Sequence, residues 1–167
     1  MTERHAVTDC WSEIRTVDQI IRYRRVGSGH TVIVLALEQE ICPNVAQALT
    51  GAGGLRLIMP EPPMEHVHVA GWVADFLEGI GATSVSLLAT SSFCMDAIEL
   101  AMSGSEQIER LVLVANEPGG FGRWCEGVQR GTAESDSRVK RVPILLVHKG
   151  QPLDEVGPLV RDFLGVS

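Results

Sequence analysis

The sequence lacks a hydrophobic run long enough to cross a membrane. A spanning helix needs about 20 consecutive apolar residues, and polar residues interrupt every apolar stretch of this 167-residue chain well before that length. The opening residues, MTERHAVTDCWSEIR, contain no apolar core of the kind that a secretion signal requires. These absences predict a cytoplasmic location.

Basic residues are also scarce, since 14 Lys and Arg stand against 21 Asp and Glu, giving a net charge of −7. Because this charge repels phosphate backbones and acidic lipid surfaces, and no stripe of Lys and Arg offsets it, we expect neither nucleic acid nor membrane as a partner. Hydrophobic residues nonetheless make up 45% of the chain, which is typical of a folded globule. The length predicts a single domain over residues 1–167.

Metal and cofactor motifs are missing as well. The four cysteines show no CxxC spacing and are interpreted as reduced thiols. His66 and His68 form an H-x-H pair in a proline-rich loop, but a zinc site needs a third or fourth ligand. The Gly27-Ser28-Gly29 stretch is too short for a phosphate loop. The sequence therefore predicts no metal and no cofactor.

What the chain does contain is a regular alternation of apolar runs and amphipathic segments. The apolar runs predict buried strands over 31–37, 55–59, 84–89, 110–115 and 142–148. Apolar residues at helical spacing predict helices near 69–80, 94–103 and 154–164, with a short one after Pro43. Ahead of these, RTVD and QIIRYRRV predict an antiparallel hairpin that ends at Gly27. This alternation indicates an α/β protein with a mostly parallel sheet.

Chemically active residues follow the predicted strands. In an open α/β sheet, ligands bind outside the carboxyl ends of the strands. The polar residues at or just after those ends are Glu38, Glu61, Ser91, Ser92, Glu117 and His148. A serine, a histidine and several carboxylates are therefore predicted at one edge of the sheet, and these are the residue types of nucleophilic catalysis.

The order of elements resembles that of the α/β-hydrolase superfamily over nearly the whole chain. RYRRVGSGHTVIVLAL is similar to the entry hairpin and third strand, and RVPILLVHKG looks like the seventh strand. VAGWVADFLEGIGATSVSLLATSSFCMDAIELAMSGSEQIERLVLVAN resembles the helix, elbow strand, elbow helix and sixth strand. The resemblance implies a three-layer α/β sandwich with an N-terminal antiparallel hairpin, truncated after the seventh strand. The family's cap is reduced to about residues 117–140.

The resemblance places the family's nucleophile on Ser91, with Ser92 as the alternative. The G-x-S-x-G motif of the nucleophile elbow becomes A-T-S-S-F over residues 89–93. The lost glycines normally let strand and helix approach closely around a strained turn. We therefore expect the ring of Phe93 to fill the volume of a substrate acyl group or to wedge the strand from the helix. Serines at this junction also serve simply to cap a helix.

The other catalytic positions of the family fall on weaker matches. Its oxyanion motif falls on Leu37 and Glu38, where a carboxylate opposes a developing negative charge. Its acid after the seventh strand falls on Leu153, one position before Asp154. Glu117, which follows the sixth strand, is therefore the candidate acid, and Asp154 is the alternative. The family's catalytic histidine should follow an eighth strand that this sequence does not show. His148 is then the candidate for a displaced base, although a histidine at a strand end also serves simply to bind a neighbouring loop.

Two functions stay open on this basis. The first is a minimal serine hydrolase of small esters or thioesters, in which Ser91 attacks, His148 takes the proton, and Glu117 or Asp154 orients the imidazole. Backbone amides near Leu37 and Ser92 would hold the oxyanion, and Phe93 would lie beside the substrate. The second is an inactive α/β-hydrolase-like protein that binds a small ligand or a partner chain. A seventh strand with a free edge predicts pairing with a second copy as a homodimer.

Overall fold

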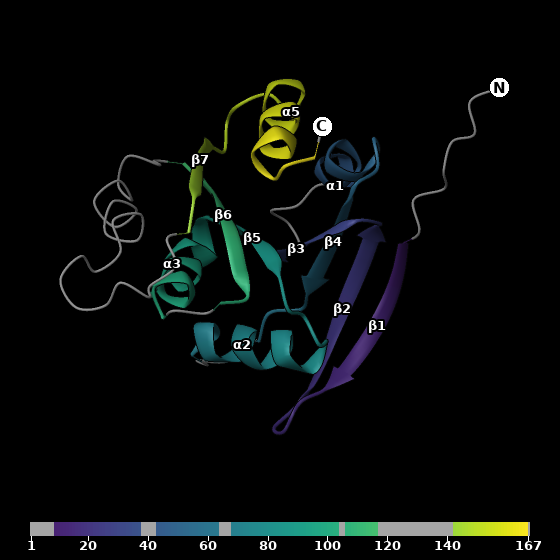
Figure 1. Cartoon of the computed structure of the whole chain (residues 1–167), viewed down its shortest axis with the longest axis vertical. Helices are drawn as coiled ribbons and strands as arrows, with labels where there is room; N and C mark the ends of the chain where they lie inside the picture. Colours follow the sequence, from purple (N-terminus) through teal and green to yellow (C-terminus); the bar gives the residue numbers. More distant parts are fainter. Residues whose placement is uncertain (1–8, 38–42, 64–67, 104–105, 117–141, 167) are drawn as a thin grey trace.

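A computed structural model of the chain describes residues 9–37, 43–63, 68–103, 106–116 and 142–166. Its centre is a seven-stranded sheet in the order β1-β2-β4-β3-β5-β6-β7 (Figure 1). The strands are β1 Asp9–Arg15, β2 Ile20–Gly27, β3 His30–Leu35, β4 Leu55–Pro60, β5 Val85–Thr90, β6 Ile108–Ala115 and β7 Ile144–His148. The first two pairings, β1 with β2 and β2 with β4, are antiparallel, and all later ones are parallel.

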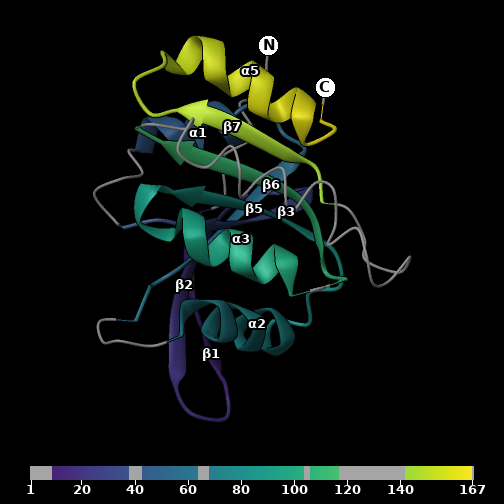
Figure 2. The ribbon, with the colours of Figure 1, turned by 90° about the vertical axis from the view of Figure 1, so that its left-hand side faces the viewer.

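Helices cover both faces of the sheet, as the two views in Figures 1 and 2 show. The α-helices are α1 Pro43–Thr50, α2 Val69–Gly79, α3 Cys94–Met102 and α5 Leu153–Phe163, and a short 3₁₀ turn, η2, spans Ser91–Phe93. Helices α2 and α3 pack on one face, and α1 and α5 lie side by side on the other. The predicted three-layer α/β sandwich with an antiparallel entry hairpin is therefore confirmed. No helix of the described part of the chain is long and apolar enough to cross a bilayer.

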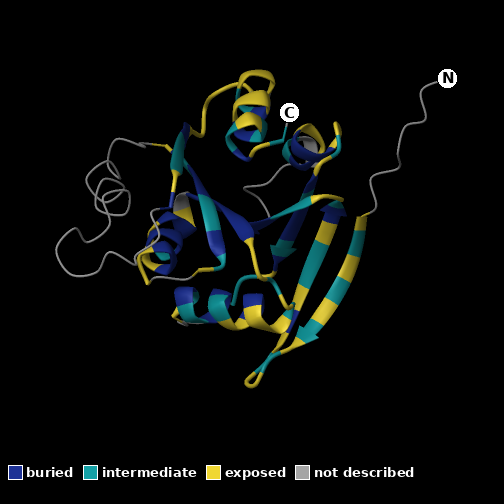
Figure 3. Ribbon diagram, in the orientation of Figure 1, coloured by how far each residue is buried: buried dark blue, intermediate teal, exposed yellow. Residues whose placement is uncertain are grey.

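Burial explains why the apolar runs predicted the central strands correctly. Every residue of β5 is buried, as are Val32–Leu35 in β3, because helices cover both sides of these strands. Figure 3 shows the buried residues gathered in the middle of the sheet and on the inner sides of the helices. On the α2 face, Phe76 is fully buried and packs against the rings of Trp72 and Tyr23, at centroid distances of 6.3 and 5.4 Å.

The entry hairpin is confirmed, but its first strand was predicted in the wrong place. Strand β1 is Asp9–Arg15, and RTVD, apart from Arg15, forms the turn, which a hydrogen bond from the Thr16 amide to the Gln19 carbonyl (2.8 Å) closes. The reason is that β1 is an edge strand whose side chains alternate between exposed and half-buried. It therefore contains polar residues and shows no continuous apolar run. Val17, which suggested a strand, is fully exposed at the tip of the turn.

The last strand leads directly into the last described helix. Helix α5 follows β7 after a short turn and is fixed to α1 by Arg161, whose guanidinium donates to the carbonyls of Leu49 (2.6 Å) and Gly53 (2.9 Å). Among the described strands, β7 pairs with β6 alone. Pairing of its other edge with a second copy of the chain stays a prediction.

Candidate ligand site at the carboxyl ends of the strands

The turn after β5 is the centre of the predicted catalytic site, and the residues Thr90 and Phe93 on either side of its serines have ordinary backbone angles. Thr90 ends the strand in an extended conformation (φ −92°, ψ 172°), and Phe93 leads into α3 with φ −117° and ψ 2°. Among the described residues, no residue other than glycine has a positive φ. A nucleophile elbow is a sharp, strained turn that raises the serine hydroxyl above the sheet. Here the connection from strand to helix is the 3₁₀ turn Ser91–Phe93.

Phe93 lies in the core and does not point into solvent. It is 8% exposed and belongs to the apolar cluster between the sheet and helices α2 and α3. That its ring fills the volume of a substrate acyl group or wedges the strand from the helix stays a prediction. The small residues Ala89, Ala97 and Ala101 in the same cluster leave room for a strand and helix to approach where the family uses glycine. The thiol of Cys94 is buried and donates to the carbonyl of Thr90 at 3.3 Å, so this cysteine is a packed residue.

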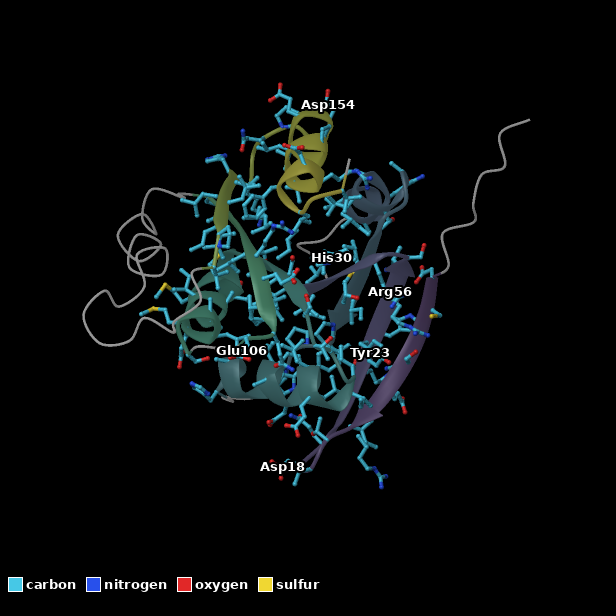
Figure 4. All side chains as sticks on the ribbon, in the orientation of Figure 1. Asp18, Tyr23, His30, Arg56, Glu106 and Asp154 are labelled. Atoms are coloured by element: carbon cyan, nitrogen blue, oxygen red, sulfur yellow. The ribbon has the colours of Figure 1, made fainter. Side chains whose placement is uncertain are left out.

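Of the two serines in this turn, the structure describes the side chain of Ser92 alone. Ser92 is exposed, and the side chain of Ser91 lies outside the described part of the structure. Glu38 and Glu117 also lie outside it, so their predicted roles stay predictions. The half-buried Leu37 packs against the core cluster on the α2 face. Asp154 is exposed in the first turn of α5, at the outer end of that helix in Figure 4, where a carboxylate favours the helix N-terminus.

His148 lies on the predicted edge of the sheet, but its hydrogen bond is wrong for a base. The register pairs Thr90 with Val114 and Val114 with Val147, so the ends of β5 and β7 are level and about 10 Å apart, at two strand spacings of about 4.8 Å. The Nδ1 atom of His148 accepts a hydrogen bond from the Gly150 amide (3.1 Å). A neutral ring held this way carries its proton on Nε2 and cannot accept one there.

Two hollows lie at this end of the sheet that the sequence did not reveal. One, of about 80 Å³, lies between α1 and α5 above the ends of β5, β6 and β7, and Thr90 and Lys149 help to line it. These residues are immediate neighbours of Ser91 and His148, the predicted pair. In the sequence, only the alternation of side chains along β7 pointed to this hollow. It places Val147, and Lys149 just after the strand, on the face opposite His148.

The second hollow, of about 190 Å³, lies at the ends of β3 and β4 and is lined in part by Trp11, Arg24 and Leu37. Two charged residues line it, and both have ionic partners: the Arg24 guanidinium donates to both carboxylate oxygens of Asp9, one at 2.7 Å, and the Glu61 carboxylate lies 3.7 Å from the guanidinium of Arg22. That hydrogen bond lowers the pKa of Asp9 below its ordinary value, against the opposing effect of burial. This hollow therefore combines two paired charges with an exposed indole ring.

A polar cluster on α2 and α3 stands apart from both hollows. His68 caps α2 by accepting from the Gly71 amide at Nδ1 (3.1 Å), and its Nε2 lies 2.7 Å from Glu99. Burial raises the pKa of the neighbouring Asp96, the charge of Glu99 adds to the increase, and the Asp96 amide and His68 oppose it. Within the described ranges, no group of three His, Cys, Asp or Glu residues could hold a metal ion.

The raised pKa of Asp96 predicts a pH-dependent gain in stability for Asp96→Asn. The folded protein holds this proton more tightly than the unfolded chain, so the associated stability is lost as pH rises through the folded pKa. At pH 7 the variant should gain up to about 0.5 kcal/mol in unfolding free energy. The gain should vanish below the ordinary pKa of 3.8. Urea denaturation across pH measures it, with the exposed Asp75→Asn as a control; a difference that grows toward acid would contradict the assignment.

Strand order, the helix layers and a turn-to-helix junction after the fifth strand define an α/β-hydrolase fold. Among solved structures, epoxide hydrolase VrEH1 from Vigna radiata matches with TM-score 0.54 and 17% identity over 64% of this chain and 39% of that one. Epoxide hydrolase I from potato (Solanum tuberosum) matches with TM-score 0.55 and 16% identity, over 64% and 40%. Cfl2 from Burkholderia cenocepacia matches with TM-score 0.50 and 23% identity, over 65% and 43%.

These likenesses show the fold alone, because the identities are low. The aligned part of this chain covers about two fifths of the length of each of those structures. No protein-family model matches the sequence, and no curated protein matches it.

Proposed function

We propose that this chain is an α/β-hydrolase-fold protein that binds a small ligand at the carboxyl ends of its strands and does not hydrolyse esters through Ser91. The observation that carries the proposal is the 3₁₀ turn Ser91–Phe93, which has ordinary backbone angles at Thr90 and Phe93 and replaces the sharp turn of a nucleophile elbow. A serine that is not raised and paired with a base is a weak nucleophile.

The state of His148 supports the same proposal. For this residue to act as the base, Nε2 must be free of its proton, and Nδ1 must carry it and donate to a carboxylate. In the structure Nδ1 instead accepts from the Gly150 amide. Catalysis would therefore require the ring to give up this hydrogen bond and to change tautomer.

A serine hydrolase of small esters or thioesters is the second candidate. One observation favours it: Ser91 directly follows β5, and His148 ends β7 at the same level of the sheet. In that mechanism Ser91 attacks the carbonyl, and Glu117 or Asp154 orients His148. Backbone amides near Leu37 and Ser92 receive the oxyanion.

A fluorophosphonate probe distinguishes the two functions, because it labels activated serines. We expect the probe not to label the folded parent protein. We also expect the parent and Ser91→Ala to show the same turnover of p-nitrophenyl acetate. The Ser92→Ala variant is the matched control, since it removes a neighbouring hydroxyl from the same turn. Labelling of the parent and of Ser92→Ala that disappears in Ser91→Ala would overturn the proposal in favour of the hydrolase.

A further inference from the structure

Another hollow lies at the opposite end of the sheet, where the parallel strands begin and α2 ends. It measures about 300 Å³ and is lined by residues of β2, β3 and β4 and of the turn between α2 and β5. Its polar lining residues carry guanidinium and hydroxyl groups: Tyr23, Arg25, Thr31, Arg56, Thr83 and Ser84. None of the described residues that line it is acidic. The hollow is therefore positively charged and rich in hydrogen-bond donors.

The register of the sheet brings the two arginines of this hollow together. Both lie on the face that α2 covers, because Tyr23 and Ile58, two positions along each strand, pack in the core cluster on that face. Arg25 is paired with Ile58, so Arg56 is its diagonal neighbour, about 7–8 Å away across β2 and β4. Thr31 of β3 lies directly opposite Arg56 on its other side; Tyr23 and Arg56 are labelled in Figure 4. One small anion can therefore reach both guanidinium groups.

Neither of these arginines has an acidic partner among the described residues. The other two arginines of β2 do, since Arg22 and Arg24 each form an ion pair with a carboxylate. Within the described ranges, the guanidinium of Arg25 donates to the sulfur of Cys10 alone (3.5 Å), and the half-buried Arg56 makes no hydrogen bond or ion pair. Two like charges on neighbouring strands repel each other. An anion bound between them would replace this repulsion by attraction.

Two features of the chain oppose an anion here, and both are weak at this position. The C-terminal end of α2 carries a partial negative charge, but the amides of Ile80, Gly81 and Ala82 donate to three of its last carbonyls, each at 3.0 Å. Two full guanidinium charges outweigh what is left of this partial charge. The net charge of −7 acts over longer distances, where salt screens it.

We propose that this hollow binds a phosphate group, held by the guanidinium groups of Arg25 and Arg56 and by the hydroxyl of Thr31. A phosphate monoester carries a charge of about −2 and three strong acceptor oxygens, which match two positive charges and several separate donors. The planar fork of arginine donates two parallel hydrogen bonds to phosphate oxygens. The inference goes beyond the proposed function and does not depend on it, since this hollow lies at the other end of the strands.

An NMR titration of the folded chain with inorganic phosphate, at a mildly alkaline pH where the dianion predominates, tests the proposal. We expect the amides of Thr31 and Arg56 to shift, and we expect acetate, with one charge and two oxygens, to bind at least tenfold more weakly. Failure of phosphate to bind, or equal binding of acetate, would overturn the proposal. Glycerol 3-phosphate distinguishes the two sources of the group: tighter binding than inorganic phosphate assigns the hollow to a phosphate monoester, and equal or weaker binding assigns it to free phosphate.

Substitutions test whether the two arginines bind the phosphate or instead stabilise the end of α2. Arg25→Gln and Arg56→Gln should each weaken phosphate binding at least tenfold, and Arg56→Lys should fall between parent and Arg56→Gln, because lysine keeps the charge without the fork. Arg15→Gln, which removes the same charge at the far end of the hairpin, should leave binding unchanged. Without phosphate, the melting temperatures of the glutamine variants should equal or exceed that of the parent, since a repulsion is removed. Lower melting temperatures with unchanged phosphate binding would show that the arginines stabilise α2 and would overturn the proposal.

Discussion

Replacing Phe93 by alanine is expected to lower the free energy of unfolding by about 3–5 kcal/mol, the usual cost of removing a buried aromatic ring. The ring is 8% exposed and belongs to the core cluster on the α2 face. Its removal leaves a cavity where strand and helix meet. Urea denaturation followed by circular dichroism measures the loss.

The same variant separates a structural ring from one that blocks a substrate. Phe93→Ala should not gain hydrolysis of p-nitrophenyl acetate, because removal of the ring supplies no base for Ser91: Nδ1 of His148 accepts from the Gly150 amide. Phe93→Leu is the matched control and should cost under about 1.5 kcal/mol, since it keeps most of the apolar volume. A small loss of stability together with new activity that depends on Ser91 would show that the ring had been obstructing an elbow.

Replacing Arg161 by methionine should cost about 1.5–3 kcal/mol, the range for hydrogen bonds made by a charged group. Its guanidinium joins α5 to the carbonyls of Leu49 and Gly53 at the end of α1, and methionine keeps an apolar stem without a donor. Relative to the parent, amide exchange in the variant should also become faster in α5, while exchange in α3 stays unchanged. Thermal denaturation and hydrogen exchange measure the two effects.

Arg161→Lys is the control for charge. An ammonium keeps the favourable charge near the helix end but lacks the rigid fork that reaches two carbonyls at once. Its stability should fall between those of the parent and Arg161→Met. Equal stability of all three proteins would mean that these hydrogen bonds contribute nothing to the attachment of α5.

The sequence predicted the buried strands well because covering helices make their burial uniform. The runs over 31–37, 84–89 and 110–115 became β3, β5 and β6 within one or two residues at each end. Edge strand β1 was harder, because half of its side chains face solvent. There the outward residues carry no periodic apolar signal, and the turn could not be located from the alternation alone.

The candidate site was less predictable, because it depends on contacts that the sequence does not encode locally. Ser91 and His148 were correctly placed at the carboxyl ends of two strands, but the hydrogen bond from the Gly150 amide to His148 depends on the conformation of the turn after β7. The 3₁₀ turn Ser91–Phe93 ends at a residue that is buried in the core among residues distant in the sequence. The α1–α5 cavity joins residues more than 100 positions apart, such as Val45 and Val160.

The strand order also has a consequence for how the chain folds during synthesis. Strand β2 pairs with β4 and not with β3, which follows it directly. An isolated two-stranded hairpin is marginal in water, so the β1–β2 hairpin must wait until Pro60, the last residue of β4, has left the ribosome. Until then an unpaired edge is exposed to other nascent chains. Mutations that weaken β4 should therefore lower the yield of folded protein through aggregation during translation, before the α1–α5 face has been made.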